Sequence, residues 1–331
     1  MRGFIESLPK VELHVHLEGS IPLQTLFDLV KQYGGDASAP TLEALQARFR
    51  YRDFPHFIET WVWKNRYLRE YSDFERISEA VAREFVRRRI TYAEVFYSPP
   101  DFARQGLKVG ELTTAIRRGL DRAPLVTVRL IADVVRDYGP LRALSFVEEL
   151  AELRSLGVVG IGLGGSEQTY PPEPFEAVFE RARRLGLRTT AHAGEAAGPE
   201  SIWGAIDVLR VDRIGHGTRA IEDAQLVAEL VGRRIPIEAC LTSNVLTGAA
   251  RSFESHPARE LLEQGAQLSL HTDDPAMFGC SIDDEYENYA RAFGASREEI
   301  LQLLDNAIAA SWMSDEERVR HRGELIAAAS R

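Results

Sequence analysis

Val11-Glu12-Leu13-His14-Val15-His16-Leu17-Glu18-Gly19 is the stretch that decides the fold of this 331-residue chain. Apolar residues alternate around its two histidines, a pattern typical of a buried β-strand. Because side chains in a strand repeat every two residues, His14 and His16 point to the same face. Two imidazoles side by side favour a shared divalent metal ion, and a hydrogen-bonded pair of core histidines is the alternative.

Seven further β-branched runs follow this strand and alternate with segments of helical periodicity. Such alternation is typical of a parallel sheet built from βα units. We expect strands at Val11–Leu17, Thr91–Tyr97, Val126–Val134, Val158–Leu163, Leu187–Ala193, Arg213–Gly217, Ile235–Leu241 and Gln267–Thr272. Helical segments are predicted between and after them, among them Ala143–Leu156, Phe175–Leu185, Asp223–Val231 and Glu299–Ala310.

This order predicts an α/β fold, a (β/α)₈ TIM barrel that forms a single domain over residues 1–331. An open, doubly wound sheet is the alternative. That fold needs a glycine-rich phosphate loop after an early strand, whereas the first strand here runs into His16-Leu-Glu-Gly-Ser20.

The segment Ile21–Glu84 is too long for a simple crossover, and we expect a helical insertion after the first strand. Its large apolar residues, aromatic except for one isoleucine, recur at helical spacing, which favours an insertion with a small core of its own. A subset of them lining an apolar pocket mouth is the alternative. The residues concerned are Phe54, Phe57, Ile58, Trp61, Tyr67, Tyr71 and Phe74.

Composition limits the classes of partner. The formal net charge is −10 and the basic residues are scattered, so we expect no nucleic-acid partner, because backbone binding needs a positive surface. No apolar run is long enough to span a membrane, and the first nine residues do not resemble a signal peptide, so we expect a cytoplasmic protein without membrane contact. Two cysteines, Cys240 and Cys280, make no disulfide framework, in agreement with a reducing compartment.

The predicted strands end in polar residues, and TIM-barrel enzymes place their chemistry at the carboxyl ends of the strands. Five of the eight histidines lie at such ends. The strand-end groups are His14 with His16, Gly162–Glu167, His192–Glu195, His216 and His271–Asp274. His56, His256 and His321 lie in helical or loop context, where we expect surface or structural roles.

Three imidazoles and one carboxylate suit a zinc ion with a position left for water, and the chain offers His14, His16, His192 and Asp273. Bound zinc brings the pKa of that water near neutrality. Glu195 and His216 are the remaining ionisable groups at the right end of adjacent strands, and we expect them to serve as acid and base. A carboxylate that only favours a helix N-terminus, and a hydrogen-bonded core histidine, are the respective alternatives.

The lysine content favours one metal ion over two. Some barrel hydrolases hold two metals through a carboxylated lysine at the end of the fourth strand. Only four of the 40 basic residues here are lysines, and none lies near that or any later strand end. We therefore expect one Zn²⁺ per chain.

The strand-end motifs together resemble those of the adenosine deaminase family. They are Leu8–Gly19, Ala191–Ser201, Arg213–Gly217, Leu241–Asn244 and Ser269–Met277, in family order over nearly the whole chain. The resemblance implies a (β/α)₈ barrel of the amidohydrolase superfamily that releases ammonia from a small-molecule 6-aminopurine.

The resemblance also implies a role for each matching residue. His14, His16, His192 and Asp273 would bind zinc. Glu195 would protonate the purine N1, and His216 would orient the attacking water. Asp274 would bind N7, and the Gly165 backbone would contact N3.

Two positions depart from the adenosine-specific pattern. Glu18 stands where those deaminases carry an aspartate near the ribose 5′-hydroxyl, and Gly162–Glu167 has smaller residues than their fourth-strand motif. A longer acid and more space favour a nucleoside with an enlarged 5′ group, such as aminodeoxyfutalosine of menaquinone biosynthesis, with Glu18 in contact with substrate. Adenosine is the alternative, followed by free adenine. A non-catalytic nucleoside-binding protein is disfavoured, because every ligand and the acid are retained.

Overall fold

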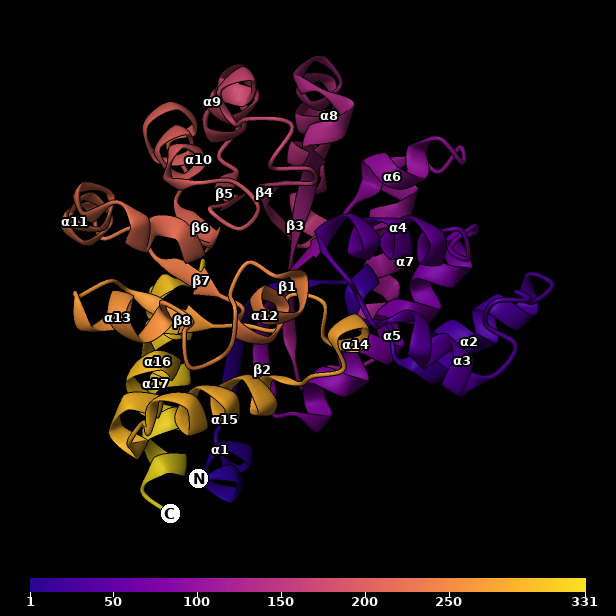
Figure 1. The fold of residues 1–331 in the computed structure, drawn as a ribbon. Coiled ribbons are helices and arrows are strands. Elements are labelled where there is room, and N and C mark those ends of the chain that lie inside the picture. The colour runs from indigo at the N-terminus through magenta and orange to yellow at the C-terminus, as the bar shows by residue number, and fades with distance from the viewer.

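The computed structural model describes residues 1–331 and contains eight parallel strands in the order β1 to β8. Seen in Figure 1, they form the centre of a (β/α)₈ barrel with helices around the outside, as the sequence predicted. The strands are β1 (Lys10–His16), β2 (Ile90–Tyr97), β3 (Thr127–Val135), β4 (Val158–Gly164), β5 (Arg188–Ala193), β6 (Arg213–His216), β7 (Ile237–Ala239) and β8 (Leu268–Leu270).

The ring of strands closes at Asp273. Its backbone N–H donates to the carbonyl of His14 at 2.9 Å, and its carbonyl accepts from the N–H of His16 at 2.8 Å. An isolated parallel bridge pairs Val15 with Asp273, three residues beyond the end of β8. Closure of the barrel therefore places Asp273, just after β8, beside His14 and His16 of β1.

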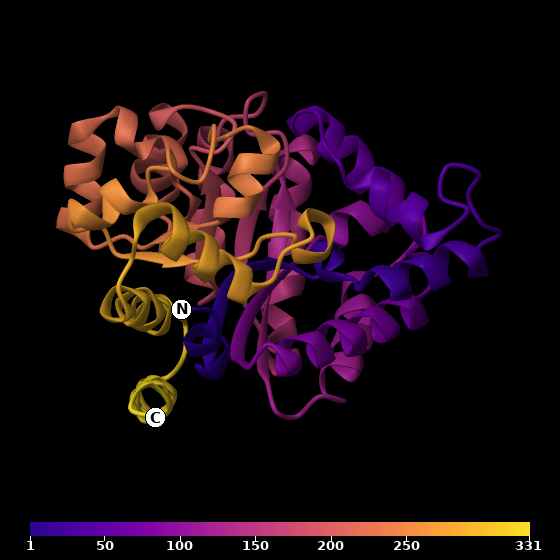
Figure 2. The same cartoon turned by 60° about the horizontal axis from the view of Figure 1, so that its bottom comes forward.

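The predicted insertion after β1 consists of four helices, which project to one side of the barrel in Figure 2. Trp63, Tyr67 and Phe74 of this insertion belong to the main hydrophobic core. A separate small cluster joins Phe57 to Met277 and Phe278, so only one face of the insertion has a core of its own. The four helices are α2 (Leu23–Gln32), α3 (Leu42–Arg48), α4 (Phe54–Asn65) and α5 (Tyr71–Arg87).

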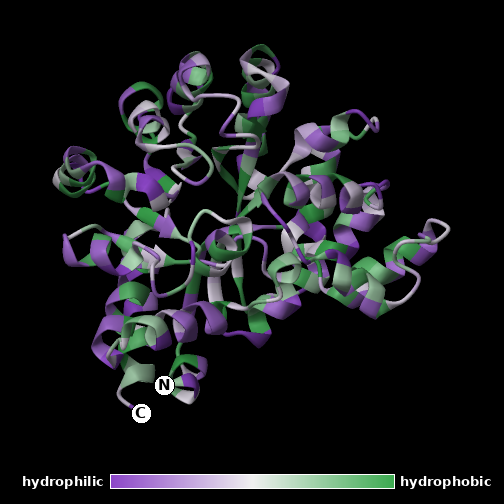
Figure 3. Ribbon diagram, in the orientation of Figure 1, coloured by the Kyte–Doolittle hydropathy of each residue, from purple (hydrophilic) through white to green (hydrophobic).

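The remaining helices follow the strands or cap the barrel. The four helices predicted by residue range correspond to α8, α9, α11 and α16 and differ from them by a few residues; no bounds were predicted for the others, α17 among them. Figure 3 shows hydrophobic residues concentrated on the strands and on the inward faces of the helices. No helix has the length and apolar character needed to cross a membrane. The helices are α1 (Arg2–Ser7), α6 (Pro99–Ala103), α7 (Val109–Leu120), α8 (Pro140–Glu152), α9 (Glu176–Arg184), α10 (Pro199–Trp203), α11 (Ala224–Arg233), α12 (Leu241–Thr247), α13 (Ala258–Glu263), α14 (Pro275–Phe278), α15 (Ile282–Phe293), α16 (Arg297–Ala310) and α17 (Asp315–Ala329).

The last two strands before closure are shorter than predicted. The expected strands Ile235–Leu241 and Gln267–Thr272 shrink to three residues each in β7 and β8. Leu241 begins α12 instead, and Thr272 already belongs to the loop that leads to Asp273. Both residues are still buried, so the hydrophobic pattern continues past the point where strand pairing ends.

Candidate active site

A cavity of about 190 Å³ opens at the carboxyl ends of the strands, beneath helix α4. Its lining brings together predicted site residues from five separate strand ends. They are His16, Gly165, His192, Glu195, His216, Asp273 and Asp274. A larger cavity of about 650 Å³ lies outside this group, between α3, α5 and the loop that carries α14, and it contains none of the predicted catalytic residues.

Four donor atoms of the predicted metal ligands converge on one point at the cavity floor. His192 Nε2 lies 3.1 Å from both His14 Nε2 and His16 Nε2. Asp273 Oδ1 lies 3.3 Å from His16 Nε2 and 3.7 Å from His14 Nε2. Donors about 2.0–2.2 Å from one zinc ion in tetrahedral geometry lie roughly 3.3–3.6 Å apart, so these residues fit the metal.

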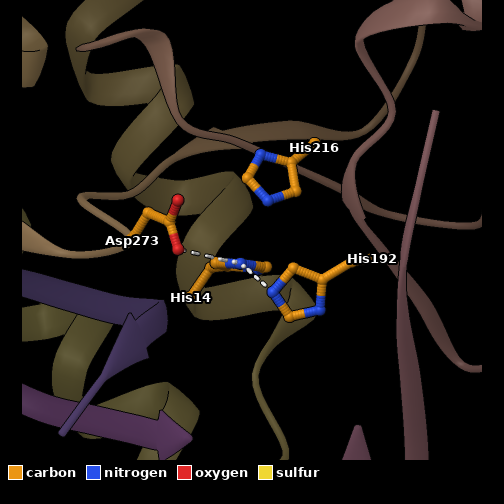
Figure 4. Close-up of side chains that lie close together, drawn as sticks. All are labelled: His14, His192, His216 and Asp273. Carbon is orange, nitrogen blue, oxygen red and sulfur yellow. Dashed lines mark hydrogen bonds and ion pairs between the residues drawn. The ribbon is translucent and has the colours of Figure 1, made fainter. Parts of the chain in front are cut away.

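His216 stands beside this group. A wider set, with ligand atoms within 4.8 Å of one another, joins His216 to His14, His192 and Asp273, and Figure 4 shows its ring facing the other three side chains. His16 Nε2 lies 3.1 Å from His192 Nε2 and 3.3 Å from Asp273 Oδ1, whereas Asn244 already binds one nitrogen of His216. The set with His16 therefore fits a tetrahedral ion.

Three of these four residues have a hydrogen-bond partner that sequence reasoning did not assign. Glu238 Oε2 lies 2.8 Å from His14 Nδ1, which directs Nε2 of that ring toward the metal position. The Ser243 hydroxyl donates to Asp273 Oδ2 at 2.6 Å and leaves Oδ1 free to coordinate. A buried Arg136 donates to the backbone carbonyl of His192 at 2.6 Å.

Glu238 keeps its charge although it is completely buried. Burial alone would raise its pKa, but the Arg213 guanidinium, 2.5 Å away, and the hydrogen bond with His14 lower the pKa of Glu238 to about 2. Arg213 also pairs with Glu94 at 2.6 Å. An anionic partner increases the basicity of a ligating imidazole, so Glu238 supports metal binding by His14.

A chain of hydrogen bonds determines the tautomer of His216. The N–H of Ala258 donates to His256 Nδ1 at 3.1 Å, so the proton of neutral His256 is on Nε2, which lies 3.1 Å from Asn244 Oδ1. The Asn244 amide nitrogen must then face His216 Nδ1, at 3.0 Å. His216 therefore carries its proton on Nε2, the nitrogen that faces the site.

This chain also changes the expected chemistry of His216. Burial lowers the pKa of His216 to about 3, so the ring is neutral at working pH. A neutral ring with its proton on Nε2 donates a hydrogen bond and does not accept a proton there. His216 thus suits the orienting role implied by the family better than that of a general base.

Glu195 is placed by a second carboxylate. The side chain of Glu167, on the loop after β4, accepts N–H bonds from Gly194, Glu195, Ala196 and Ala197 at 2.6–3.1 Å. This clamp fixes the loop that presents Glu195, whose Oε2 lies 3.5 Å from His216 Nε2. Burial, with the charges of Asp273 and Glu167, raises the pKa of Glu195 well above its usual range, as a group that delivers a proton requires.

Asp274 is buried and has an unpaired oxygen. Burial and the neighbouring Asp273 charge raise the pKa of Asp274 to about 8, which favours the protonated carboxyl at neutral pH. Its Oδ1 has no hydrogen-bond partner. That oxygen occupies the space that a Cβ at Gly19 would need, so only glycine fits there. A protonated carboxyl can donate to a ring nitrogen such as N7.

The two other predicted substrate contacts differ in position. Gly165 lines the cavity at φ +96°, a conformation that favours glycine. Glu18 does not line it. The chain enters a 3₁₀ turn at Glu18–Ser20 directly after β1, and this turn directs the buried Glu18 carboxylate to the N–H of Ser98, at 3.0 Å. Ser98, the partner of the Glu18 carboxylate, does line the cavity.

One wall of the cavity is apolar. Phe54, Phe57, Ile58 and Trp61 of α4 line it, whereas Tyr67, Tyr71 and Phe74 do not. The alternative interpretation, a pocket mouth, therefore applies to the four residues of α4, and packing into the main core applies to Tyr67 and Phe74.

Comparisons with known proteins agree with this geometry. The family model for adenosine deaminase matches residues 9–328. The chain is 35% identical over 331 residues to an aminodeoxyfutalosine deaminase of Streptomyces avermitilis, with 98% of this chain and 92% of the relative covered. It is 37% identical over 330 residues to an adenosine deaminase of Salmonella newport (97% and 99% covered) and 32% identical over 323 residues to an adenine deaminase of Hahella chejuensis (97% and 96%).

Solved structures match over the whole barrel. An amidohydrolase from Burkholderia ambifaria with bound Zn superposes with a TM-score of 0.91 at 28% identity, over 99% of this chain and 92% of that one. The Arabidopsis protein ADAL complexed with IMP superposes with a TM-score of 0.89 at 27% identity, over 99% and 98%.

Fold and site thus define an amidohydrolase-type barrel deaminase, a hydrolase of carbon–nitrogen bonds in adenine-type substrates. The chain belongs to the adenosine deaminase family.

Proposed function

We propose that this chain is a zinc-dependent hydrolase that deaminates a 6-aminopurine nucleoside, and that its favoured substrate carries an enlarged 5′ group, as aminodeoxyfutalosine does. The observation that carries the reaction is the convergence of His14, His16, His192 and Asp273 beside the acid Glu195. These four residues would hold one zinc ion, which when bound lowers the pKa of a coordinated water and supplies a nucleophile near neutral pH.

The residues around the metal position would protonate the purine, orient the attacking water and hold the purine ring. Glu195 delivers a proton to N1, which makes C6 electrophilic. His216 donates from Nε2 to the attacking water and aligns it with C6. Asp274, protonated, donates to N7 and fixes the purine plane, and the backbone at Gly165 borders the N3 edge. Water oxygen replaces the amino group at C6, and the amino nitrogen leaves as ammonia.

Two features support a 5′-extended nucleoside. The apolar wall from α4 supplies surface for a group larger than a hydroxyl. Glu18, longer than the aspartate of adenosine-specific relatives, is engaged by the Ser98 backbone, and we propose that it sets the shape of the 5′ end through Ser98. The similarity to the Streptomyces avermitilis aminodeoxyfutalosine deaminase supports the same assignment.

Adenosine is the second candidate, favoured by the similarity to the Salmonella newport adenosine deaminase. A 5′-phosphate is disfavoured. Seven of the 21 residues that line the cavity are aspartate or glutamate, and none is lysine or arginine. A phosphate placed among these carboxylates has no cation to pair with.

The test is a deamination panel of adenine, adenosine, methylthioadenosine, S-adenosylhomocysteine, aminodeoxyfutalosine and AMP, followed at the purine absorbance band. We expect kcat/KM for a 5′-extended nucleoside to exceed that for adenosine by more than about tenfold, with AMP poorest among the nucleosides and nucleotides. Adenosine as the best substrate would overturn the 5′-extended assignment and leave an adenosine deaminase.

A further inference from the structure

One carboxylate in the wall of the active-site cavity has no partner. Asp133 lies on β3 and lines the cavity together with Val135, two residues further along the same face of the strand. The Asp133 side chain is 4% exposed, and its Oδ1 is buried without a hydrogen-bond partner. An unpaired carboxylate oxygen in a buried position is costly unless a ligand or a water supplies a donor.

The neighbouring carboxylates of the cavity wall already have partners. Asp101 accepts from the Tyr138 hydroxyl at 2.9 Å and from an indole N–H of α4 at 3.2 Å. Asp137 accepts from the backbone N–H and the hydroxyl of Ser166, at 2.9 and 2.7 Å. Among the carboxylates at the ends of β2 and β3, Asp133 is therefore the one that is free to bind a ligand.

Two glycines of β4 make room for the Asp133 side chain. A Cβ at Gly164 would overlap with the Asp133 carboxylate, and one at Gly162 would lie 2.9 Å from its Oδ1. The sequence predicted that these small residues leave space for an enlarged 5′ group. In the structure the Asp133 carboxylate takes up that space, so the glycines of β4 allow a charged group to reach the cavity.

The order of the strands places the sugar of a bound nucleoside beside Asp133. Around the purine ring, N7, C6, N1 and N3 follow one another, and N9, which carries the sugar, comes next. In the proposed complex N7 faces Asp274 after β8, N1 faces Glu195 after β5 and N3 faces Gly165 at the end of β4. N9 then faces β3 and β2. With the 5′ carbon toward Ser98, just after β2, the 2′ and 3′ hydroxyls fall on the side of β3.

We propose that Asp133 binds the ribose of the substrate by accepting hydrogen bonds from its 2′ and 3′ hydroxyls. The inference rests on the proposed function, because it uses the purine contacts assigned there. Burial raises the pKa of Asp133 to about 6, so the carboxylate is mostly ionised at neutral pH and can only accept. Two adjacent hydroxyls offer two donors to its two oxygens. Asp133 thus selects ribonucleosides over deoxynucleosides and over free adenine.

The test compares adenosine, 2′-deoxyadenosine and 3′-deoxyadenosine with the zinc-loaded enzyme. We expect the wild-type kcat/KM for adenosine to exceed that for at least one deoxynucleoside by about tenfold, the effect of one hydrogen bond to a charged group. Asp133→Ala should bring the ratios close to one, because it removes the acceptor. The variant should fold normally, since it removes a buried charge that has no partner in the chain. Wild-type ratios close to one would refute the sugar contact.

Asp137→Ala is the matched control. It removes the same charge from the same cavity wall, but from a carboxylate whose two oxygens are occupied by Ser166. Asp137→Ala should leave the adenosine-to-deoxyadenosine ratios at their wild-type values. Ratios that fall equally in both variants would mean a general effect of charge and would overturn the assignment of Asp133.

Zinc content separates a sugar contact from support of the metal site. Asp133→Ala should keep one zinc ion per chain and lose activity mainly toward adenosine. Loss of zinc, with an equal fall in kcat/KM for all three nucleosides, would mean that Asp133 serves the metal ligands and does not bind the ribose.

A second variant moves the carboxylate without removing it. Gly164→Ala should displace the Asp133 side chain and lower the adenosine-to-deoxyadenosine ratios, whereas in the Asp133→Ala background it should not change them further. Unchanged ratios in Gly164→Ala alone would contradict the inferred position of the ribose. If no nucleoside is deaminated, the proposed function fails, and calorimetric affinities of the three nucleosides for wild type and Asp133→Ala still decide whether Asp133 binds the ribose.

Discussion

At the scale of single residues, Glu195 and His216 differ most clearly in their protonation chemistry, because their pKa values shift in opposite directions. Burial raises the pKa of Glu195 well above its usual range and lowers that of His216 to about 3, so the environment favours the protonated form of Glu195 and the neutral form of His216. In the proposed reaction the acid would supply the proton for N1, and the histidine would supply only a hydrogen bond. Environments that push two pKa values apart are how enzymes assign acid and base roles.

Glu195→Gln should retain zinc and substrate affinity and lose at least about 10²-fold in kcat, because an amide of the same shape cannot deliver the proton. Elemental analysis, substrate binding by calorimetry and steady-state rates check the three parts. Near-normal turnover would mean that Glu195 only fills a place at the start of its loop.

Asn244→Asp tests the tautomer of His216. An aspartate can only accept a hydrogen bond, so it favours the tautomer of His216 with its proton on Nδ1, and Nε2 is then no longer a donor in the site. We expect kcat to fall at least about tenfold with little change in KM, and the two ring nitrogens to exchange their chemical shifts in ¹⁵N NMR spectra. Thr218→Val is the control, because it removes the 2.9 Å hydrogen bond to Asn244 Oδ1 and leaves His216 untouched. Unshifted spectra in Asn244→Asp would contradict the relay.

The role of Asp274 is tested by a double cycle with a 7-deaza substrate, in which carbon replaces N7. If the protonated carboxyl donates to N7, the 7-deaza change costs the wild type heavily and costs Asp274→Ala little more than it has already lost. Values of kcat/KM for the four combinations give the coupling. Additive losses would assign Asp274 to another atom.

At the scale of elements, helix α4 separates substrate from solvent with one face and packs into the core with the other. Phe57 lines the cavity and stacks on Phe278 of α14, with ring centres 5.3 Å apart, so it joins the apolar wall to the segment that carries Asp274. Trp63 on the other face belongs to the main core.

Phe57→Ala should lower kcat/KM for a 5′-extended nucleoside more than for adenosine, by roughly tenfold in the ratio, because it removes apolar contact surface that only the longer substrate uses. Trp63→Phe, on the same helix, should reduce the melting temperature and leave the ratio unchanged. Both are measured by thermal unfolding and the substrate panel. Equal loss for the two substrates in Phe57→Ala would place the 5′ group elsewhere.

Sequence patterns identified most strands and helices, but they were less informative about where these elements end and about which distant residues contact the site residues. Alternation around His14 and His16, and the polar strand ends, were enough for the barrel and the ligand cluster. They could not predict that Glu238, in an ordinary-looking strand, binds His14, because that contact joins residues 224 positions apart. His256 was assigned a structural role, and its hydrogen bond to Asn244 became visible only once the loop after α12 was folded. Glu18 was predicted to contact substrate because the hydrophobic pattern of the sequence does not reveal that a 3₁₀ turn begins directly after β1. This turn directs the Glu18 side chain away from the cavity.

At the scale of the whole molecule, metal binding and barrel closure depend on the same residue. Asp273 bridges β8 to β1 through two backbone hydrogen bonds, at φ +61°, and its side chain completes the ligand cluster. A cation at the centre of this cluster would be attracted by all four side chains at once, since their donor atoms lie 3.1–3.7 Å apart. Zinc should therefore stabilise the closed barrel as well as activate water.

We expect one zinc ion per chain by elemental analysis, and a fall in melting temperature of at least about 5 °C when a strong chelator removes it, since a ligand that binds only the folded state stabilises that state. His192→Ala should lose zinc and activity together and should melt close to the chelated wild type, with no further fall on adding chelator. His321→Ala, a buried histidine far from the cluster, is the control: its melting temperature also falls, but its zinc content stays at one. Two zinc ions per chain would contradict the prediction of one ion that was based on the absence of a lysine at the end of the fourth strand. An unchanged melting temperature after removal of zinc would mean that Asp273 closes the barrel independently of the metal.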